Sequence, residues 1–277
     1  ELACQIASEA APRPDWLVME LSSYQIEAAP ALAPRIGIWT TLTPDHLERH
    51  GSLEAYRAIK RGLLERSVSA LLNADDPDLR QQRSSWQRGT WVSSEGACPD
   101  GQPADLWIDA EGMVRSNATT LFAADVLAMP GCHNRQNLLL VTAAALEIGL
   151  SPQQIADALG TFPGVPHRLE KLGTFAGASV YNDSKATNYD AAEVGLQAMQ
   201  EPVVVVAGGQ TKRGDASGWL KQLHNKACIC SPTVTSDRKA PKHKHSGPWG
   251  KLCTDMLNRV YTVWLVDELQ LWECECS

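Results

Sequence analysis

The sequence has few of the features that mark membrane-bound or secreted proteins. It has no run of about 18 apolar residues, so we expect no helix that spans a bilayer and no membrane partner. The first residues, ELACQIASEAAPRPDW, contain neither a basic leader nor an apolar signal core. The net charge over 277 residues is -7, a mildly acidic balance. We therefore expect a cytoplasmic protein that does not bind nucleic acid.

The sequence also has too few cysteines for a disulfide scaffold, since eight would suit only a much shorter chain and Cys4, Cys98 and Cys132 are widely scattered. Five of them fall after residue 226. A zinc site there is disfavoured, since the spacing is C-x-C and not the C-x-x-C of zinc knuckles. A disordered or mistranslated end is the interpretation that we favour. The ligands considered were Cys228, Cys230, Cys274, Cys276, His243 and His245.

No internal repeat is present, and short apolar runs alternate with helical patterns. Three stretches are typical of buried strands that end in polar loops: DWLVMELSS (15–23), RIGIWTTLT (35–43) and VSALLNADD (68–76). The pattern SLEAYRAIKRGLLERS predicts a helix with Ser52 as its N-cap. The alternation predicts an α/β fold with a parallel sheet flanked by helices.

Later patterns continue this organisation. NRQNLLLVTAAALEIGL predicts a helix that closes at Gly149, and SPQQIADALGTF predicts another with Ser151 as cap and Pro152 in its first turn. The segment from Thr90 to Asp125 has isolated tryptophans and turn residues, which predict a small antiparallel excursion.

A domain boundary is expected in TFPGVPHRLE, where two prolines and a glycine interrupt both neighbouring patterns. Beyond it, ASVYND, NYDAAEVGLQAM and PVVVVAGG predict a strand, a helix and a second strand, which form one βαβ unit of a parallel sheet. After about Lys226 no helical or strand period is sustained. We therefore expect domains at 1–164 and 165–226, with a divergent tail of uncertain structure at 227–277.

A candidate metal ligand lies at the end of the first predicted strand. Glu20 ends an apolar run, where a carboxylate can hold Mg²⁺ directly or through water, although a merely solvated acid is equally compatible. Thr43, Asp45 and His46 fill the loop between the next strand and helix.

Lys60 interrupts an apolar helical stripe formed by Tyr56, Leu63 and Leu64. Burial would lower the pKa of its amine, which could then react with carbon dioxide to give a carbamate, a carboxylate-like metal ligand. Periodicity alone favours the simpler interpretation, a lysine whose stem is buried while its charge reaches water.

Other candidates would bind an anionic ligand. Asn137, with His133 and Asn134, lies near a predicted helix N-terminus, where these residues could hold a nucleotide or only cap the helix. Arg168 could grip a phosphate or ribose, or pair with Glu170.

In YNDSKATNYD, helix capping by Thr187 with Asp190 leaves Asp183 and Lys185 unexplained. This acid and this cation, at a strand end, suit a ligand that carries hydroxyls and negative charge. AGGQTKRGD follows the next strand with two glycines and then Lys212.

Seven stretches occur in the order in which one family has them: ELSSYQIE, TPDHLERH with the later AIK, LNADDP, GCHNRQN, PGVPHRLE, NDSKATN and AGGQTKRGD. Together they resemble the Mur ligase family, from about residue 15 to about residue 220. LSSYQIE favours the branch that adds D-glutamate over the branches that act on other amino acids.

The resemblance implies an ATP- and Mg²⁺-dependent enzyme of peptidoglycan precursor synthesis, acting as a monomer. ATP would phosphorylate the carboxylate of UDP-N-acetylmuramoyl-L-alanine, and the amine of D-glutamate would attack the acyl phosphate. The implied metal ligands are Glu20, His46 and a carbamylated Lys60, of which His46 and Lys60 are also catalytic. This reverses the preference for a snorkelling Lys60.

The resemblance also implies ligand-binding residues. Asn137 would lie near the adenine, and Arg168 and Asp183 would reach the nucleotide from the second domain. Lys185, Thr187 and Lys212 would hold D-glutamate.

The sequence departs from the family pattern in three respects. The glycine-rich phosphate loop expected before Glu20 and the UDP-binding domain are missing, and the resemblance ends near Lys226. Since the first residue is not Met, we expect an N-terminally truncated central domain, followed by a partial Rossmann-like domain. A reading-frame shift would explain the tail. We expect this chain to be inactive alone; the alternatives are another amide ligase such as folylpolyglutamate synthase, or a non-catalytic nucleotide-binding fragment.

Overall fold

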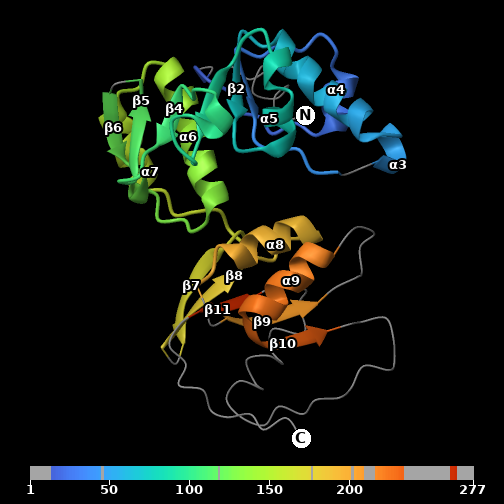
Figure 1. The fold of residues 1–277 in the computed structure, drawn as a ribbon, viewed down its shortest axis with the longest axis vertical. Coiled ribbons are helices and arrows are strands. Elements are labelled where there is room, and N and C mark those ends of the chain that lie inside the picture. Colours follow the sequence, from blue (N-terminus) through green and yellow to red (C-terminus); the bar gives the residue numbers. More distant parts are fainter. Residues whose placement is uncertain are drawn as a thin grey trace, which may run out of the picture. The chain divides into compact units, whose positions relative to one another are not determined.

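The protein is described by a computed structural model that covers residues 14–44, 47–117, 119–175, 177–200, 203–208, 216–233 and 263–266 (Figure 1). It contains a six-stranded sheet with the order β1-β2-β3-β4-β5-β6 and a five-stranded sheet with the order β10-β9-β11-β8-β7. Residue contacts divide the chain into two compact units. One unit contains residues up to 38 together with 44–70, and the other contains 39–43 and the residues from 71 onward.

The six-stranded sheet is parallel where helices connect its strands and antiparallel where short turns do. β2 pairs parallel with β3, and β3 with β4, whereas β4, β5 and β6 form antiparallel pairs. The antiparallel excursion predicted for 90–125 is therefore confirmed for β4 to β6 but wrong for β3. The strands are β1 (Ile36–Trp39), β2 (Ser69–Asn73), β3 (Thr90–Ser93), β4 (Leu106–Ile108), β5 (Met113–Ser116) and β6 (Thr119–Ala123).

The predicted helices around this sheet form with the predicted caps. The Ser52 side chain accepts from the backbone of Ala55, and Ser151 forms a capping box with Gln154 after which Pro152 begins the helix. Gly149 has φ of 92° just beyond the end of its helix, a conformation that favours glycine. The helices are α2 (Ser23–Ala28), α3 (Leu47–His50), α4 (Leu53–Arg66), α5 (Pro77–Gln81), α6 (Cys132–Glu147) and α7 (Pro152–Gly160), with 3-10 turns η1 (Arg83–Ser85), η2 (Pro99–Gly101) and η3 (Ala124–Val126).

The core of this part lies between α6 and the sheet, because α6 packs on β3 and β4. Its leucines and the strand residues that they face are almost wholly inaccessible to solvent. Each such side chain contributes roughly 1.5–3 kcal/mol by leaving water. The most buried are Leu71, Leu72, Val92, Leu138, Leu139 and Leu140.

The strand predicted for DWLVMELSS is wrong. Residues 16–22 have no regular secondary structure, and Val18 is 94% exposed. A strand needs a hydrogen-bonded neighbour, and β1 ends the sheet on this side. The apolar pattern of residues 16–22 indicates that they suit burial, but it does not show whether another strand is available to pair with them.

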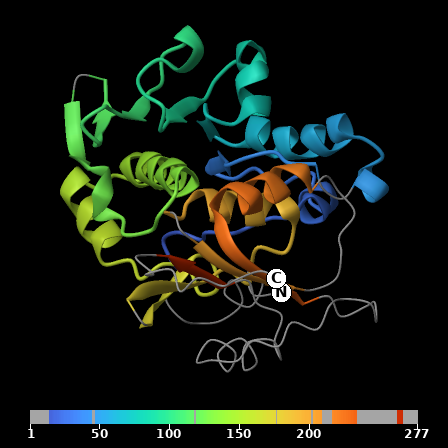
Figure 2. The same cartoon turned by 60° about the horizontal axis from the view of Figure 1, so that its bottom comes forward.

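The five-stranded sheet is mixed, because the predicted βαβ unit is joined by an antiparallel strand that the sequence did not predict. β8, α8 and β9 form where the sequence predicted them, but β11 lies between β8 and β9 and runs antiparallel to both. β8 and β9 therefore run in the same direction without pairing. α8 and α9 pack together on this sheet (Figures 1 and 2). The elements are β7 (Glu170–Phe175), β8 (Ala178–Asn182), α8 (Tyr189–Gln197), β9 (Val203–Gly208), α9 (Ser217–Lys226), β10 (Ala227–Thr233) and β11 (Val263–Val266).

Two of these strands come from the stretch that sequence analysis placed in a divergent tail. β10 pairs parallel with β9, and β11 joins β8 to β9, so two segments of the tail whose structure was left uncertain form strands of this sheet. The cysteine and histidine side chains considered as zinc ligands lie outside the part of the chain whose side chains are described. The predicted domain boundaries stay a prediction. Within the described ranges, no helix is long and apolar enough to cross a membrane.

Candidate functional site

The loop after β2 contains a buried acid that connects two strand ends. Asp76 is 3% exposed, and its Oδ1 accepts from the backbone N–H of Leu79, which caps α5. Its Oδ2 accepts from the Thr41 hydroxyl at 2.7 Å and from the Leu42 N–H at 3.0 Å. Since a buried carboxylate is costly unless hydrogen-bonded, this arrangement stabilises the loop after β1 as well as the helix.

The same stretch connects β3 and α6 to that loop. The Asn73 amide donates to the Thr40 carbonyl at 2.9 Å and to Gln136 Oε1 at 3.2 Å. Asp75 accepts from the Ser93 hydroxyl at 2.6 Å and from the Ser94 N–H at 2.7 Å. Sequence reasoning matched LNADDP to the family but missed this role. The signal was three polar residues at the end of an apolar strand.

Glu20 and Lys60 both belong to the first compact unit. Glu20 is exposed at the end of the irregular apolar segment. Lys60 is half-buried on α4, and the buried residues of that helix are Tyr56, Leu63 and Leu64, so the predicted stripe is confirmed. The Lys60 Nζ lies 5.0 Å from the centroid of the Tyr56 ring. Asp45 and His46 lie outside the described residues.

A serine and a histidine that sequence analysis did not select meet near this lysine. The Ser23 hydroxyl, 2% exposed, lies 2.9 Å from His50 Nε2. The His50 ring stacks on Tyr56, with centroids 5.5 Å apart and an interplanar angle of 27°. The contact joins ELSSYQIE to TPDHLERH, a pairing across 27 positions that no local pattern signals.

The start of α6 is an open helix N-terminus. Gly131 is the N-cap, with φ of 100° and no side-chain cap. Asn134 donates from its amide to the Pro130 carbonyl at 2.6 Å, a bond that holds the loop before the helix and caps none of the helix N–H groups. Asn137, three residues further, is half-buried.

His133, beside this N-terminus, has its pKa lowered from 6.5, first by burial and then by the positive charge of Arg168. Its Nδ1 is among the buried side-chain atoms that have no hydrogen-bond partner within the described residues. The folded chain therefore favours the neutral imidazole.

This shift predicts a pH dependence of stability. Because the pKa of His133 is lower in the folded chain, the unfolded chain binds a proton there at a higher pH than the folded chain does. The free energy of unfolding should therefore fall as the pH drops from 7 through 6.5. His133→Gln should reduce that slope, measured by urea unfolding at several pH values. His224→Gln, at an exposed position of α9, is the matched control and should leave the slope unchanged. Equal slopes for wild type and His133→Gln would contradict the assignment.

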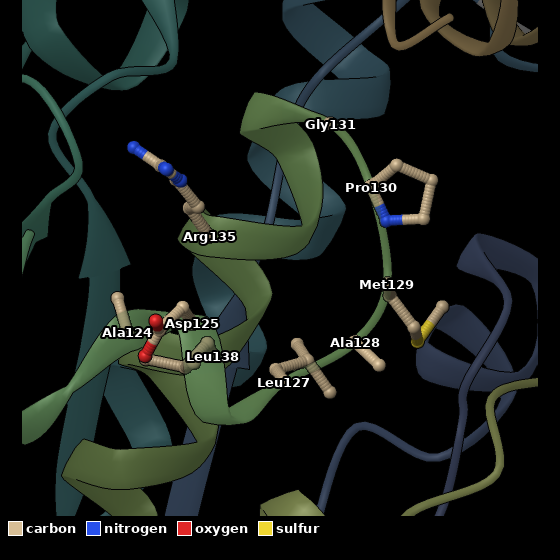
Figure 3. A pocket seen from close by; sticks show the side chains of 9 residues that line it. All are labelled: Ala124, Asp125, Leu127, Ala128, Met129, Pro130, Gly131, Arg135 and Leu138. Carbon is tan, nitrogen blue, oxygen red and sulfur yellow. The ribbon is translucent and has the colours of Figure 1, made fainter.

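One cavity of about 220 Å³ is lined by the loop that leads into this helix and by the first turns of the helix (Figure 3). Its lining comes from η3, the loop after it and the α6 face that carries Arg135 and Leu138, and it does not include Asn137. Its volume is below the roughly 300–1,000 Å³ of ordinary small-molecule sites. We assign it no ligand.

The stretches PHRLE and NDSKATN are brought together. Asp183, 4% exposed, accepts through Oδ1 from the Leu169 N–H at 3.1 Å. The Lys185 N–H donates to the His167 carbonyl at 2.9 Å, and the Asn182 amide lies 2.8 Å from His167 Nδ1. These bonds fix the linker against the loop after β8.

Arg168 is exposed and lies between His167 and Leu169, the two linker residues that bond to the loop after β8. Its neighbours His167 and Leu169 have φ of 65° and 44°, a left-handed backbone that is unfavourable for both residue types. Strain of this kind persists where surrounding contacts determine it, and it concentrates at binding sites. Glu170, the alternative partner of Arg168, instead accepts from the His167 N–H at 2.7 Å and from the Asn182 amide at 3.3 Å.

The predicted cap of α8 is wrong by one residue. Asn188, not Thr187, is the N-cap and accepts from the Ala191 N–H at 2.8 Å. Both residue types are good caps, so the pattern could not separate them. Thr187 and Lys185 are exposed on the loop that follows Asp183. Lys212 lies outside the described residues.

These observations define the class of the protein: an α/β chain whose buried polar residues gather in the loops that follow its strands. Residues 2–145 match the Mur ligase middle domain, and the chain belongs to the Mur ligase family.

A curated relative, UDP-N-acetylmuramoylalanine--D-glutamate ligase of Synechococcus sp. (strain CC9605), is 88% identical over 228 residues. The match covers 82% of this chain and 50% of the relative, so the chain spans about half the length of the curated relatives it matches. Among solved structures, UDP-N-acetylmuramate-alanine ligase MurC from Thermotoga maritima has a TM-score of 0.56 at 21% identity, covering 83% of this chain and 50% of that one. An FPGS variant of L. casei has a TM-score of 0.53 at 16% identity, covering 83% and 57%. These two likenesses show the fold alone.

Proposed function

We propose that this chain is part of an ATP-dependent ligase that adds D-glutamate to UDP-N-acetylmuramoyl-L-alanine in cytoplasmic peptidoglycan precursor synthesis. The observation that carries the proposal is the 88% identity to a ligase of that name. At this identity the relative's amino-acid specificity is the best guide to this chain, whereas the fold is shared with the FPGS structure as well. We also propose that the whole protein is a monomer and serves cell shape and division through this product.

The nucleotide would be held by residues from two places in the second unit. Asn137 has an amide that can donate to and accept from an adenine edge. Arg168, exposed on its strained turn, would pair with a phosphate or ribose oxygen. Asp183 uses one carboxylate oxygen to hold the linker at Leu169, so its role would combine ligand contact with placement of Arg168.

The proposed set of metal ligands is complete only when Lys60 carries a carbamate. Within the described part of the chain, no three His, Cys, Asp or Glu side chains form a cluster that could hold a metal ion. Glu20 offers the oxygen that Mg²⁺ prefers, but an unmodified Lys60 amine is not such a ligand. A Lys60 carbamate with Glu20 and His46 would supply the set. When bound, Mg²⁺ would neutralise the charge of the phosphates and of the acyl phosphate.

The second substrate would be held by cations and a hydroxyl. Lys185 and Thr187, both exposed, with Lys212, would bind the two carboxylates of D-glutamate. Its amine, oriented by these contacts, would attack the acyl carbon, form the amide and release inorganic phosphate. Orientation of this kind is the main contribution that a protein makes to such a step.

The test measures ADP release and amide formation from UDP-N-acetylmuramoyl-L-alanine, D-glutamate and ATP. It compares this chain with a version extended to the length of its curated relatives. Activity of the extended version alone is the expected result. Preference of the extended version for a folate substrate would favour the FPGS-like alternative. Absence of amide formation in both versions would overturn the proposal and leave a non-catalytic nucleotide-binding fragment.

A further inference from the structure

Two short helices of the first unit, α2 and α3, pack on the longer helix α4, which carries Tyr56 and Lys60 (α3 and α4 are labelled in Figure 1). Tyr56 is 8% exposed, so its ring is fixed by the surrounding packing. A side chain in contact with this ring is therefore placed by it.

His50 is held in turn by Ser23. The Ser23 hydroxyl is buried and lies 2.9 Å from His50 Nε2, which sets the direction of the imidazole ring. The ring of His50 then stacks on Tyr56 at 5.5 Å. A second aromatic ring, that of Tyr24, lies at the same 5.5 Å from His50, at an interplanar angle of 54°.

Lys60 contacts the other partner of His50, the Tyr56 ring. Its Nζ lies 5.0 Å from the centroid of the Tyr56 ring, within the range at which a cation is attracted to an aromatic face. The Tyr24 ring lies under a different cation, Arg49, at 5.8 Å. The two tyrosines thus contact the same histidine but different cations.

We propose that His50 and Tyr56 are positioning residues for Lys60: His50, anchored by Ser23, fixes the Tyr56 ring, and this ring places the lysine amine before the amine is modified. The inference rests on the proposed function for its catalytic consequence, since Lys60 is the proposed carbamate lysine. A long side chain with four rotatable bonds needs such a contact, because a misplacement of about 1 Å at a reacting group can cost as much as a hundredfold in rate.

The first experiment tests placement without activity. The ε-methylene protons of Lys60, assigned with Lys60→Arg in a ¹³C-lysine-labelled sample of this chain, should resonate upfield of those of the other lysines because of the Tyr56 ring. Tyr56→Leu should abolish this shift, and Tyr56→Phe, which keeps the ring, should preserve it. His50→Leu and Ser23→Ala should reduce it. Trp16→Leu, which removes an aromatic ring of the same unit that lies under Arg35, is the control and should leave it unchanged.

The second experiment tests the consequence in the extended version. Tyr56→Leu should lower kcat about tenfold or more with little change in KM, and Tyr56→Phe should restore it. If Tyr56→Leu does not fold, His50→Leu against Trp16→Leu makes the same comparison. An unshifted Lys60 in the wild type, or a shift indifferent to His50, overturns the proposal. An extended version inactive in all forms, with the shifts as expected, would overturn the proposed function and leave the placement of Lys60 standing.

Discussion

Lys60→Ala is expected to lower the rate of amide formation by about a thousandfold in the extended version of the chain, because it removes the amine from which the proposed metal ligand is made. Alanine also leaves room for a small anion beside Tyr56. Chloride or a short carboxylate such as formate should therefore restore part of the activity. The measurement is ADP release with and without D-glutamate, at increasing concentrations of the added anion.

Two controls separate a carbamate from a lysine that only packs. Lys60→Arg keeps a cation beside Tyr56 but cannot form a carbamate and fills the space, so it should be inactive and not rescued. Glu65→Ala removes the partner of Arg61 in an i,i+4 pair at the surface and should leave activity near wild type. If Lys60→Ala retained activity, or if no anion rescued it, the simpler interpretation of a snorkelling lysine would be preferred.

Features set by neighbours within four residues could be predicted from the sequence. The caps at Ser52 and Ser151 and the stripe of Tyr56 with Lys60 follow from hydrogen bonds and periodicity inside one helix. The exception is Asn188, which competes with Thr187 for the same cap, and two side chains of similar capping strength cannot be ranked from the pattern.

Features set by distant partners could not be predicted. β11 comes from residues 263–266, yet it pairs with β8 and β9, and no local signal reports this insertion. The segment at Trp16 to Met19 has the composition of a strand but no neighbour to pair with among the described residues. Pairing depends on chain topology, which periodicity does not encode.

The candidate site divides in the same way. Sequence motifs selected Lys60, Arg168, Asp183 and Lys185 as candidate site residues, but they did not indicate the hydrogen bonds and ring contacts around them. Asp76 receives hydrogen bonds from Thr41 and Leu42, which lie 35 and 34 positions away, and Ser23 meets His50 27 positions away. In the sequence, residues whose partners are distant, such as Asp76 and His50, cannot be distinguished from other polar residues.

Gly37→Ala is expected to destabilise the chain by about 1–3 kcal/mol, because β1 lies directly against the end of α4. A Cβ at position 37 would overlap the Ser67 hydroxyl and would come within 2.7 Å of Leu64 Cδ1. Neither neighbour can move away easily: Ser67 is 0% exposed and donates to the Leu63 carbonyl at 2.9 Å, and Leu64 is 3% exposed. The free energy of unfolding in urea measures the effect.

Gly62→Ala is the matched control, since it makes the same change in the same unit with the opposite expected sign. Gly62 lies inside α4, and the nearest atom that its Cβ would meet is Arg66 Nη1, at 3.1 Å and at the end of a flexible side chain. Alanine in a helix interior should therefore stabilise the chain by roughly 0.5–1 kcal/mol. If Gly37→Ala were as stable as Gly62→Ala, the close contact between β1 and α4 would be wrong. The helix that carries Tyr56 and Lys60 would then lack the fixed base on which their placement depends.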